Sequence, residues 1–433
     1  MCECLYYYFC FLNAKIIRNG GIEMGISKNH LEKYAELAVK VGVNIQKGQE
    51  LVINAPIHAI EFVRLVTDKA YQAGAKEVHF RWSDDALTLS RYTYAENEVF
   101  QHYPDWEAEG LLTLAKRGAA FLDLRTPNLD LLNSIDPEKI AMDNRTASEA
   151  LDPYKQYRMA DKVSWSILAV PSEEWANKLF PELETQKGVE KLWETLFKMT
   201  RADREDPIEA WKEHQKTLDE KLNYLNQKKY HKLHYTAPGT DLTIEFPKGY
   251  QWAGGAAENA AGTKFFPNIP TEEVFTLPLK TGVNGVVTST KPLNYSGTLI
   301  EKLSLTFKDG RIVDFNAERG YETLKRLIET DEGSHYLGEV ALVPNNSPIS
   351  ESGLIFYNTL YDENASCHLA IGKAYPKCIE NGVNMTQEEL ETKGVNKSLT
   401  HVDFMIGSAE LQIDGITESG EKEPVFREGL WAF

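Results

Sequence analysis

The chain is poor in cysteine. Only five of its 433 residues are cysteines, and three of them, Cys2, Cys4 and Cys10, lie in the first ten positions. The other two are Cys367 and Cys378, and no CxxC pair of the kind found in structural zinc sites occurs. The sequence therefore implies no disulfide framework, and the odd number of thiols indicates a reducing compartment.

Positive charge is also scarce. The chain has 47 Lys and Arg against 64 Asp and Glu, which gives a net charge of −17. Proteins that bind nucleic acid need basic patches to neutralise phosphate, and only short basic clusters occur here, so we expect no nucleic-acid partner. Aromatic residues make up 11% and are spread along the chain, which argues against disorder. The length predicts two or three domains.

Long apolar runs are missing as well. The run LYYYFCFL at residues 5–12 is too short for a membrane span, which needs about 20 apolar residues. No Lys or Arg precedes it, so it does not fit a secretory signal, and we expect no membrane partner. A clean amphipathic helix pattern begins only after Met24. We therefore expect residues 1–23 to be a translated leader outside the fold, with Met24 as the true start.

Residues 24–230 alternate between predicted strands and predicted helices, beginning with a helix that Ser27 can cap. Strand patterns occur at residues 50–55, 76–82, 119–124 and 163–170. Strands that alternate with helices indicate parallel βαβ units. No GxGxxG or GxxxxGK[ST] loop and no GxSxG elbow accompanies them, so the alternation indicates a fold rather than an organic cofactor.

The pattern changes near residues 229–237, which are basic and turn-prone. The rest of the chain has many short segments that alternate apolar and polar residues and are separated by Gly, Asn, Asp or Pro. Such segments favour antiparallel or mixed sheets. We therefore predict an α/β protein (α+β overall), with a βαβ-type N-terminal domain at 24–230 and a β-rich C-terminal domain at 231–433.

Carboxylates and imidazoles gather in four short segments of this second half. Glu272 and Glu273 are adjacent, and neighbours in an extended chain point to opposite faces, so one can bind a metal while the other faces elsewhere. Glu339 opens the apolar segment LGEVALVP. An ionised carboxylate among such residues needs a cation or hydrogen-bond donors, because its desolvation is costly.

The last two segments contain histidine. If residues 366–375 form a helix, His368 and Tyr375 lie seven residues apart and face nearly the same direction. In HVDF (401–404), the two-residue spacing places His401 and Asp403 on one face of a strand.

Mixed carboxylate and imidazole ligands suit zinc, cobalt or manganese. Six such side chains are too many for one zinc with an open position, but they suit two metals bridged by carboxylate and water. Each residue also has a structural alternative, such as a solvated Glu pair, a hydrogen-bonded strand end or a core histidine. Spacing alone favours these alternatives over a two-metal site.

Longer sequence segments favour the two-metal site over these structural alternatives. HYTAPGTDLTIEFP (234–247), PNIPTEEVFT, LGEVALVP, NTLYDENASCHLAIGKAYP and HVDFMIGS resemble the AmpS/PepS/aminopeptidase T family of metallo-aminopeptidases. AVKVGVNIQKGQELVINAP and AYQAGAKEVHFRWSDD are similar to the opening of the same family. The resemblance extends from about Met24 to the C-terminus. It implies a cytoplasmic, homodimeric exopeptidase that acts on peptides with a free N-terminus. It also implies two divalent metal ions per subunit (zinc, cobalt, manganese or magnesium) in a C-terminal catalytic domain.

The resemblance also implies roles for individual residues. The family's metal-binding positions fall on Glu273, Glu339, His368, Tyr375, His401 and Asp403. By analogy with other dinuclear aminopeptidases that use adjacent glutamates, we predict Glu272 as the general base. Tyr375 is expected to ligate a metal or to donate to the oxyanion. Two alternatives stay open: a metal-dependent hydrolase of another amide or ester, and a non-catalytic metal- or peptide-binding protein.

Overall fold

The computed structural model describes residues 25–433 except residue 129 and residues 296–297. The predicted leader at 1–23 lies outside the described residues and stays a prediction. Within the described part of the chain, no helix combines the length and the apolar character needed to cross a membrane.

The N-terminal half contains the predicted parallel sheet. Its strands pair in the order β10-β4-β3-β1-β2. The first four in sequence are β1 (Glu50–Pro56), β2 (Glu77–Ser83), β3 (Ala120–Arg125) and β4 (Trp165–Ala169). The helices of this half are α2 (Lys28–Leu37), α3 (Ile60–Gln72), α4 (Asp85–Tyr94), α5 (Asp105–Lys116), α6 (Pro137–Ala150), α7 (Asp152–Met159), α8 (Glu173–Leu179), α9 (Thr185–Met199) and α10 (Pro207–Lys228). Strands that alternate with helices form this half, as predicted.

Local signals explain how this half begins. The Ser27 side chain accepts a hydrogen bond from the backbone N–H of His30 and so caps α2. Tyr34 and Leu37 of α2 are fully buried, and they pack in the same core as Leu51 and Ile53 of β1. The apolar face of the helix is therefore covered by the sheet, as its periodicity requires.

The fifth strand of the parallel sheet comes from the other half of the chain. β10 (Asn268–Ile269) pairs with β4, with Asn268 opposite Ile167 and Ile269 opposite Leu168. Helical structure ends at Lys228 and strand structure resumes at Lys232, near the predicted boundary at 230. The two halves nevertheless interlock through β10, and the division into domains at that residue stays a prediction.

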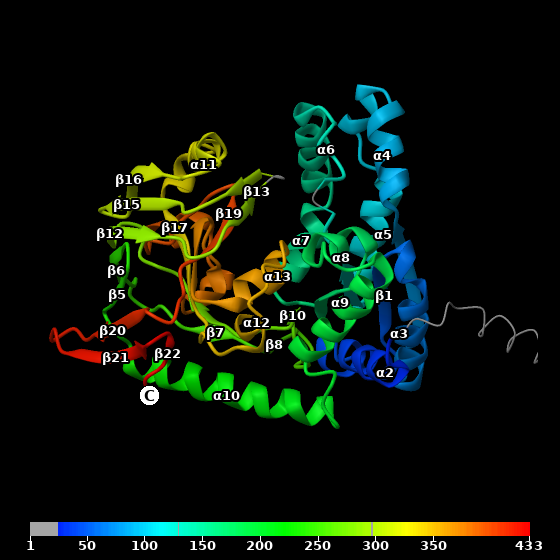
Figure 1. The fold of residues 1–433 in the computed structure, drawn as a ribbon, viewed down its shortest axis with the longest axis horizontal. Helices are drawn as coiled ribbons and strands as arrows, with labels where there is room; N and C mark the ends of the chain where they lie inside the picture. Colours follow the sequence, from blue (N-terminus) through cyan, green and yellow to red (C-terminus); the bar gives the residue numbers. More distant parts are fainter. Residues whose placement is uncertain (1–24, 129, 296–297) are drawn as a thin grey trace, which may run out of the picture.

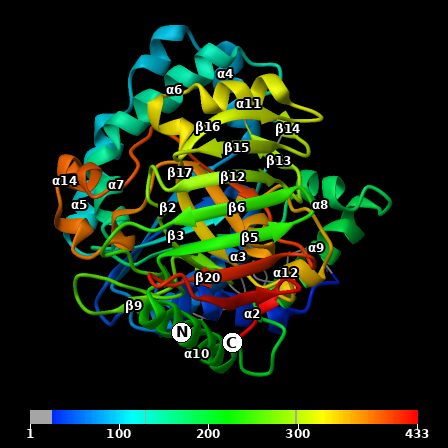
Figure 2. The same cartoon turned by 90° about the vertical axis from the view of Figure 1, so that its left-hand side faces the viewer.

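The C-terminal half is built from antiparallel sheets, so the expected mixed α/β fold class is confirmed. The larger sheet has the order β16-β15-β12-β6-β5-β20-β21-β22, and Figure 2 shows most of its strands stacked from top to bottom. Its strands are β5 (Lys232–Ala237), β6 (Thr240–Glu245), β12 (Val283–Thr288), β15 (Ser304–Lys308), β16 (Arg311–Asn316), β20 (Gln412–Ile416), β21 (Lys422–Arg427) and β22 (Leu430–Trp431).

A second sheet, of five strands, has the order β19-β18-β17-β11-β7. Its strands are β7 (Ala253–Gly254), β11 (Val274–Thr276), β17 (Leu337–Leu342), β18 (His368–Gly372) and β19 (His401–Met405). Two small hairpins are β8 (Ala257–Glu258) with β9 (Lys264–Phe265) and β13 (Leu293–Tyr295) with β14 (Thr298–Ile300). The helices of this half are α11 (Tyr321–Ile328), α12 (Pro348–Glu351), α13 (Thr359–Asp362) and α14 (Gln387–Thr392).

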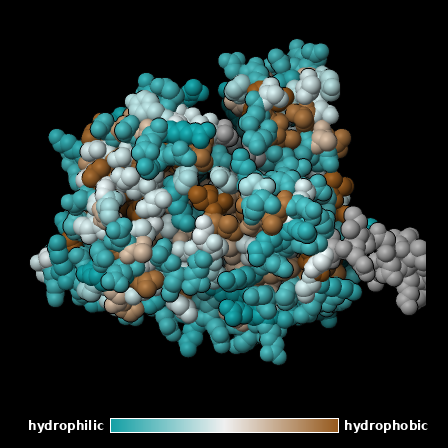
Figure 3. Space-filling model, in the orientation of Figure 1, coloured by the Kyte–Doolittle hydropathy of each residue, from teal (hydrophilic) through white to brown (hydrophobic). Residues whose placement is uncertain are grey.

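The two halves lie side by side, with the long helix α10 running beneath both of them (Figure 1). α10 contacts α2 in the N-terminal half and both β7 and β11 in the C-terminal half. We call the face of the five-stranded sheet that lies away from the large core its inner face. Between the two halves the surface is hollowed, and apolar residues gather there near the place of α13 in Figure 1 (Figure 3).

Candidate metal centre

One face of the five-stranded sheet carries five of the predicted site residues. In the register of β17, β18 and β19, Glu339 lies opposite Ala370, and Ala370 lies opposite Asp403. Directly paired residues share a face, and so do residues two positions apart. His368 and His401 therefore join Glu339 and Asp403 on this face.

Glu273 reaches the same face from the next strand. Val274 pairs with Leu342, and both are buried in the large core on the opposite side of the sheet. The residue before Val274 therefore points to the inner face. Small residues lie under the cluster there, namely Ala341, Ala370 and Gly372. Their size leaves room above the sheet for the polar side chains.

The five side chains form two groups that share one carboxylate. His368 Nε2 lies 3.1 Å from Glu273 Oε2 and 3.7 Å from Glu339 Oε1. His401 Nε2 lies 3.4 Å from Glu339 Oε2 and 3.5 Å from Asp403 Oδ1. In each group the potential ligand atoms lie within 4.8 Å of one another. Glu339 thus directs one oxygen to each group.

Backbone carbonyls fix both imidazoles. His368 Nδ1 donates to Ser366 O at 3.1 Å, and His401 Nδ1 donates to Lys373 O at 2.7 Å. A carbonyl oxygen can only accept, so the proton lies on Nδ1 in both rings. Nε2 then faces the cluster, which is the arrangement typical of metal-binding histidine.

The carboxylates are short of hydrogen-bond donors. Glu273 Oε2 and Asp403 Oδ1 are buried atoms that make no hydrogen bond among the described residues. Buried carboxylate oxygens without donors are costly unless a cation compensates them. With imidazole nitrogens at 3.1–3.7 Å and no thiolate in the cluster, the donor set fits divalent cations.

Electrostatics point the same way. Burial alone would raise the pKa of Glu339, but the neighbouring imidazoles of His368 and His401 lower it to about 2. Burial lowers the pKa of each imidazole, yet the surrounding carboxylates outweigh it and raise both pKa values. Burial raises the pKa of Glu273. In the absence of cations, protons bound to the imidazoles and to Glu273 therefore supply part of the positive charge that metal ions would otherwise bring.

Comparisons with known proteins agree with this geometry. The family model for thermophilic metalloproteases (M29) matches residues 27–431. Aminopeptidase 2 of Geobacillus stearothermophilus is 55% identical and aminopeptidase AmpS of Bacillus subtilis is 54% identical. The matches cover 94% and 93% of this chain and 98% of each relative. The solved structure of wild-type AmpT from Thermus thermophilus superposes with a TM-score of 0.89 at 41% identity, covering 94% of this chain and all of AmpT.

The chain belongs to the M29 family of metalloproteases. It is a metal-dependent aminopeptidase, and the predicted family resemblance and enzyme class are confirmed. The buried Glu and His cluster gives that activity a physical site in this M29 chain. The individual ligand assignments stay predictions, which the geometry supports for five of the six residues.

The sixth residue, Tyr375, reaches the site by an unexpected route. Residues 366–375 do not form the helix on which the shared direction of His368 and Tyr375 was conditional, because His368–Gly372 form β18, an inner strand between β17 and β19. A short buried apolar run does not distinguish a strand from a helix. Tyr375 lies beyond the strand, and its ring centroid is 4.7 Å from that of His401. Burial and the nearby carboxylates raise the pKa of the Tyr375 phenol, so it is neutral in the absence of cations.

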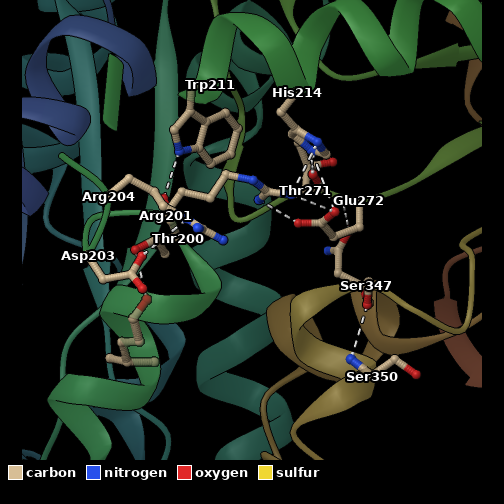
Figure 4. A network of polar contacts seen from close by, with 12 residues as sticks. Thr200, Arg201, Asp203, Arg204, Trp211, His214, Thr271, Glu272, Ser347 and Ser350 are labelled. Atoms are coloured by element: carbon tan, nitrogen blue, oxygen red, sulfur yellow. Dashed lines mark hydrogen bonds and ion pairs between the residues drawn. The ribbon is translucent and has the colours of Figure 1, made fainter. Parts of the chain in front are cut away.

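Glu272 faces away from the cluster. Both of its oxygens accept hydrogen bonds from the Arg201 guanidinium, at 2.7 and 3.0 Å (Figure 4). The expectation that adjacent glutamates point in different directions agrees with this geometry. The base role of Glu272 stays a prediction, and this pairing does not favour it, because the oxygens that would accept a proton already accept hydrogen bonds from a cation.

Glu363, which begins a turn just after α13, was not among the predicted site residues. It lines a cavity of about 240 Å³ together with Asp362 and Asp403. Burial raises the pKa of Glu363 well above its ordinary value, and the carboxylates of Glu273 and Asp403 raise it further. The only signal for it was the acidic pair Asp362-Glu363 inside the segment that also carries His368.

Proposed function

We propose that this M29 aminopeptidase removes the N-terminal residue of peptides at a centre for two divalent cations. Glu273, Glu339 and His368 would hold one ion, and Glu339, His401 and Asp403 would hold the other. The shared carboxylate of Glu339, with one oxygen near each imidazole, carries this proposal. Tyr375 is a sixth candidate ligand through its phenol oxygen.

The types of ligand atom limit which metal ions fit the centre. Carboxylate oxygens with two imidazole nitrogens suit zinc, cobalt or manganese. Magnesium prefers oxygen ligands and keeps bound water, so it would suit the carboxylates alone. The buried thiols of Cys367 and Cys378 do not belong to either ligand group.

Bound cations would lower the pKa of a water molecule and polarise the scissile carbonyl. Glu363 is placed to take the proton from that water on a carboxylate oxygen and to pass it to the leaving amine, because it lines the cavity beside Asp403. A carboxyl with a raised pKa suits this exchange near neutral pH. The Tyr375 hydroxyl, kept neutral by its surroundings, can donate to the developing oxyanion.

The cavity offers a place for the first residue of the substrate. Apolar side chains form part of its wall, among them Leu293, Ile355 and Met405. Asp362 and Glu363 add acidic groups that would attract a free α-ammonium. An apolar wall with a few polar groups is the usual composition of a small-molecule site.

The proposal is tested by chelation and reconstitution. We expect EDTA to abolish the hydrolysis of leucine 4-nitroanilide, and zinc, cobalt or manganese to restore it with two ions bound per chain. The N-acetylated substrate should not be cleaved. Cleavage of the acetylated form would favour a hydrolase of another amide or ester. Full activity with one ion per chain would refute the two-cation centre.

We also propose that the enzyme is a cytoplasmic homodimer. Large apolar side chains are exposed on the N-terminal half, including Leu87 and Trp106, which are 72% and 76% exposed. Exposed apolar patches are typical of protein contacts. Light scattering after gel filtration should give twice the mass of one chain, and cell fractionation should place the activity in the cytoplasmic fraction.

A further inference from the structure

Glu273, the residue before β11, lies on a short segment that links two sheets. Asn268 and Ile269 belong to the N-terminal parallel sheet, where they pair with β4. Val274 belongs to the C-terminal sheet, where it pairs with Leu342 of β17. Only residues 270–273 connect the two. Glu273 therefore takes its position from both halves of the molecule.

Side chains of the N-terminal half hold this link. Arg201, which follows α9, forms a two-pronged pair with Glu272, and the two side chains are only 13% and 5% exposed. His214 of α10 donates from Nε2 to Thr271 O at 2.7 Å, and its Nδ1 accepts from Arg201 at 3.2 Å (Figure 4). Two successive residues before Glu273 are thus fixed from one side.

Arg201 is itself held in place. Its backbone has φ 63°, a left-handed conformation that non-glycine residues rarely adopt. The guanidinium carbon lies 5.7 Å from the Trp211 ring centroid, and Trp211 Nε1 donates to Thr200 O at 2.7 Å. The guanidinium therefore presents its donors in a fixed direction, which suits bidentate recognition of a carboxylate.

The C-terminal half holds the link from the other side. The backbone N–H of Glu272 donates to Asn364 Oδ1 at 2.6 Å, and Asn364 is fully buried. Asn364 also donates to Leu360 O, so it is part of the segment that carries Glu363. A Cβ on Gly254 of β7 would lie 2.5 Å from Glu273 O, so only glycine permits this close approach.

We infer that Arg201 is a positioning residue for the metal centre: by holding Glu272, it fixes the direction in which Glu273 presents its carboxylate to a cation. The inference rests on the proposed role of Glu273 as a ligand. It assigns Glu272 to positioning rather than to proton transfer. It also means that the N-terminal half, whose described residues belong to neither ligand group, sets the geometry of a centre in the C-terminal half.

Arg201→Lys tests this inference, because lysine keeps the charge and loses the planar fork. Arg158→Lys is the matched control. Arg158 also pairs with a buried carboxylate, Asp123, at 2.9 Å, with side chains 16% and 7% exposed, but on the parallel sheet. We expect Arg201→Lys to weaken binding of Co²⁺ by about 10- to 100-fold and to change its visible absorption spectrum. Arg158→Lys should lower the melting temperature without either change.

Glu272→Gln is a second variant that tests the same inference, and it can be used if Arg201→Lys does not fold. If Glu272 has a positioning role, Glu272→Gln should bind Co²⁺ more weakly than the wild type. The double variant, Arg201→Lys with Glu272→Gln, should then bind Co²⁺ no more weakly than the weaker-binding of the two single variants. Wild-type Co²⁺ affinity and spectrum in both variants would overturn the inference, whether turnover is kept or lost. Glu273→Gln separates the two proposals: unchanged metal binding there would refute the ligand assignment itself.

Discussion

Glu273 Oε2 lies 3.1 Å from His368 Nε2, although the strand β17 separates the two strands that carry these residues. The contact crosses β17 above Ala341, the residue that pairs with His368. A larger side chain at that position would occupy the space between the carboxylate and the imidazole. The cluster therefore depends on the registered antiparallel sheet, and on small residues beneath it, as much as on the ligands.

Glu339→Gln should remove both cations, because Glu339 is shared by the two groups. Asp403→Asn should remove only the ion near His401, since Asp403 belongs to one group. We expect metal analysis to give two ions per chain in the wild type, one in Asp403→Asn and none in Glu339→Gln. Turnover of leucine 4-nitroanilide should fall by about 10²-fold or more in both. Equal ion contents in the two variants would contradict the shared role.

Glu363→Gln should leave the metal content unchanged and lower turnover by the roughly 10²- to 10⁴-fold typical of a lost general base. The glutamine keeps the shape of the side chain but cannot accept the proton. Metal analysis and steady-state kinetics on the same preparation check both parts. The matched control is Glu410→Gln, an exposed glutamate in the same half of the chain, which should behave as the wild type. Undiminished turnover in Glu363→Gln would refute its role as the base.

Much of this architecture was predictable because it depends on local patterns. Each of the four strand segments expected in the N-terminal half overlaps an observed strand, since runs such as 50–55 are apolar and bounded by helices. The two-residue spacing of His401 and Asp403 correctly gave a shared strand face. The alternation rule also placed Glu272 and Glu273 in different directions.

Other features depend on contacts between distant residues and left no local signal. β10 has only two residues, and it is a strand because β4 offers it a partner. Arg201 lies 71 positions from Glu272 in the sequence. Its backbone is left-handed, and no local sequence pattern predicts that conformation there. The sequence does not distinguish a strand from a helix at 368–372, because this strand is buried on both faces and shows no alternation.

The two thiols of the described chain should resist modification. Cys367 and Cys378 are 1% and 0% exposed. Burial raises the pKa of Cys367 to about 12, and it raises the pKa of Cys378 as well, so neither forms the reactive thiolate at neutral pH. In a chain that starts at Met24, we expect no reaction with Ellman's reagent in the native state and two reactive thiols after unfolding in guanidinium. A thiol that reacts within seconds in the native protein would contradict this burial.

Asp362 should make the stability of the metal-free protein depend on pH. Burial raises its pKa from 3.8 to about 6, although the backbone N–H groups of Phe356 and Asn358 and the charge of Lys291 oppose this rise. Between about pH 4 and 6 the folded protein therefore keeps a proton that the unfolded chain releases, so the free energy of unfolding decreases as the pH rises through this window. The shift corresponds to about 3 kcal/mol.

Asp362→Asn has no carboxyl group at this position and should lack that decrease. The free energy of unfolding of the variant minus that of the wild type, from urea titrations after chelation, should increase by about 2.4 kcal/mol from pH 4 to pH 7. Taking the difference cancels the other titrating groups, because they are common to both proteins. A difference that stays constant over this range would show that Asp362 is already ionised in the folded protein at pH 4. The carboxylate would then be fully stabilised by its backbone donors.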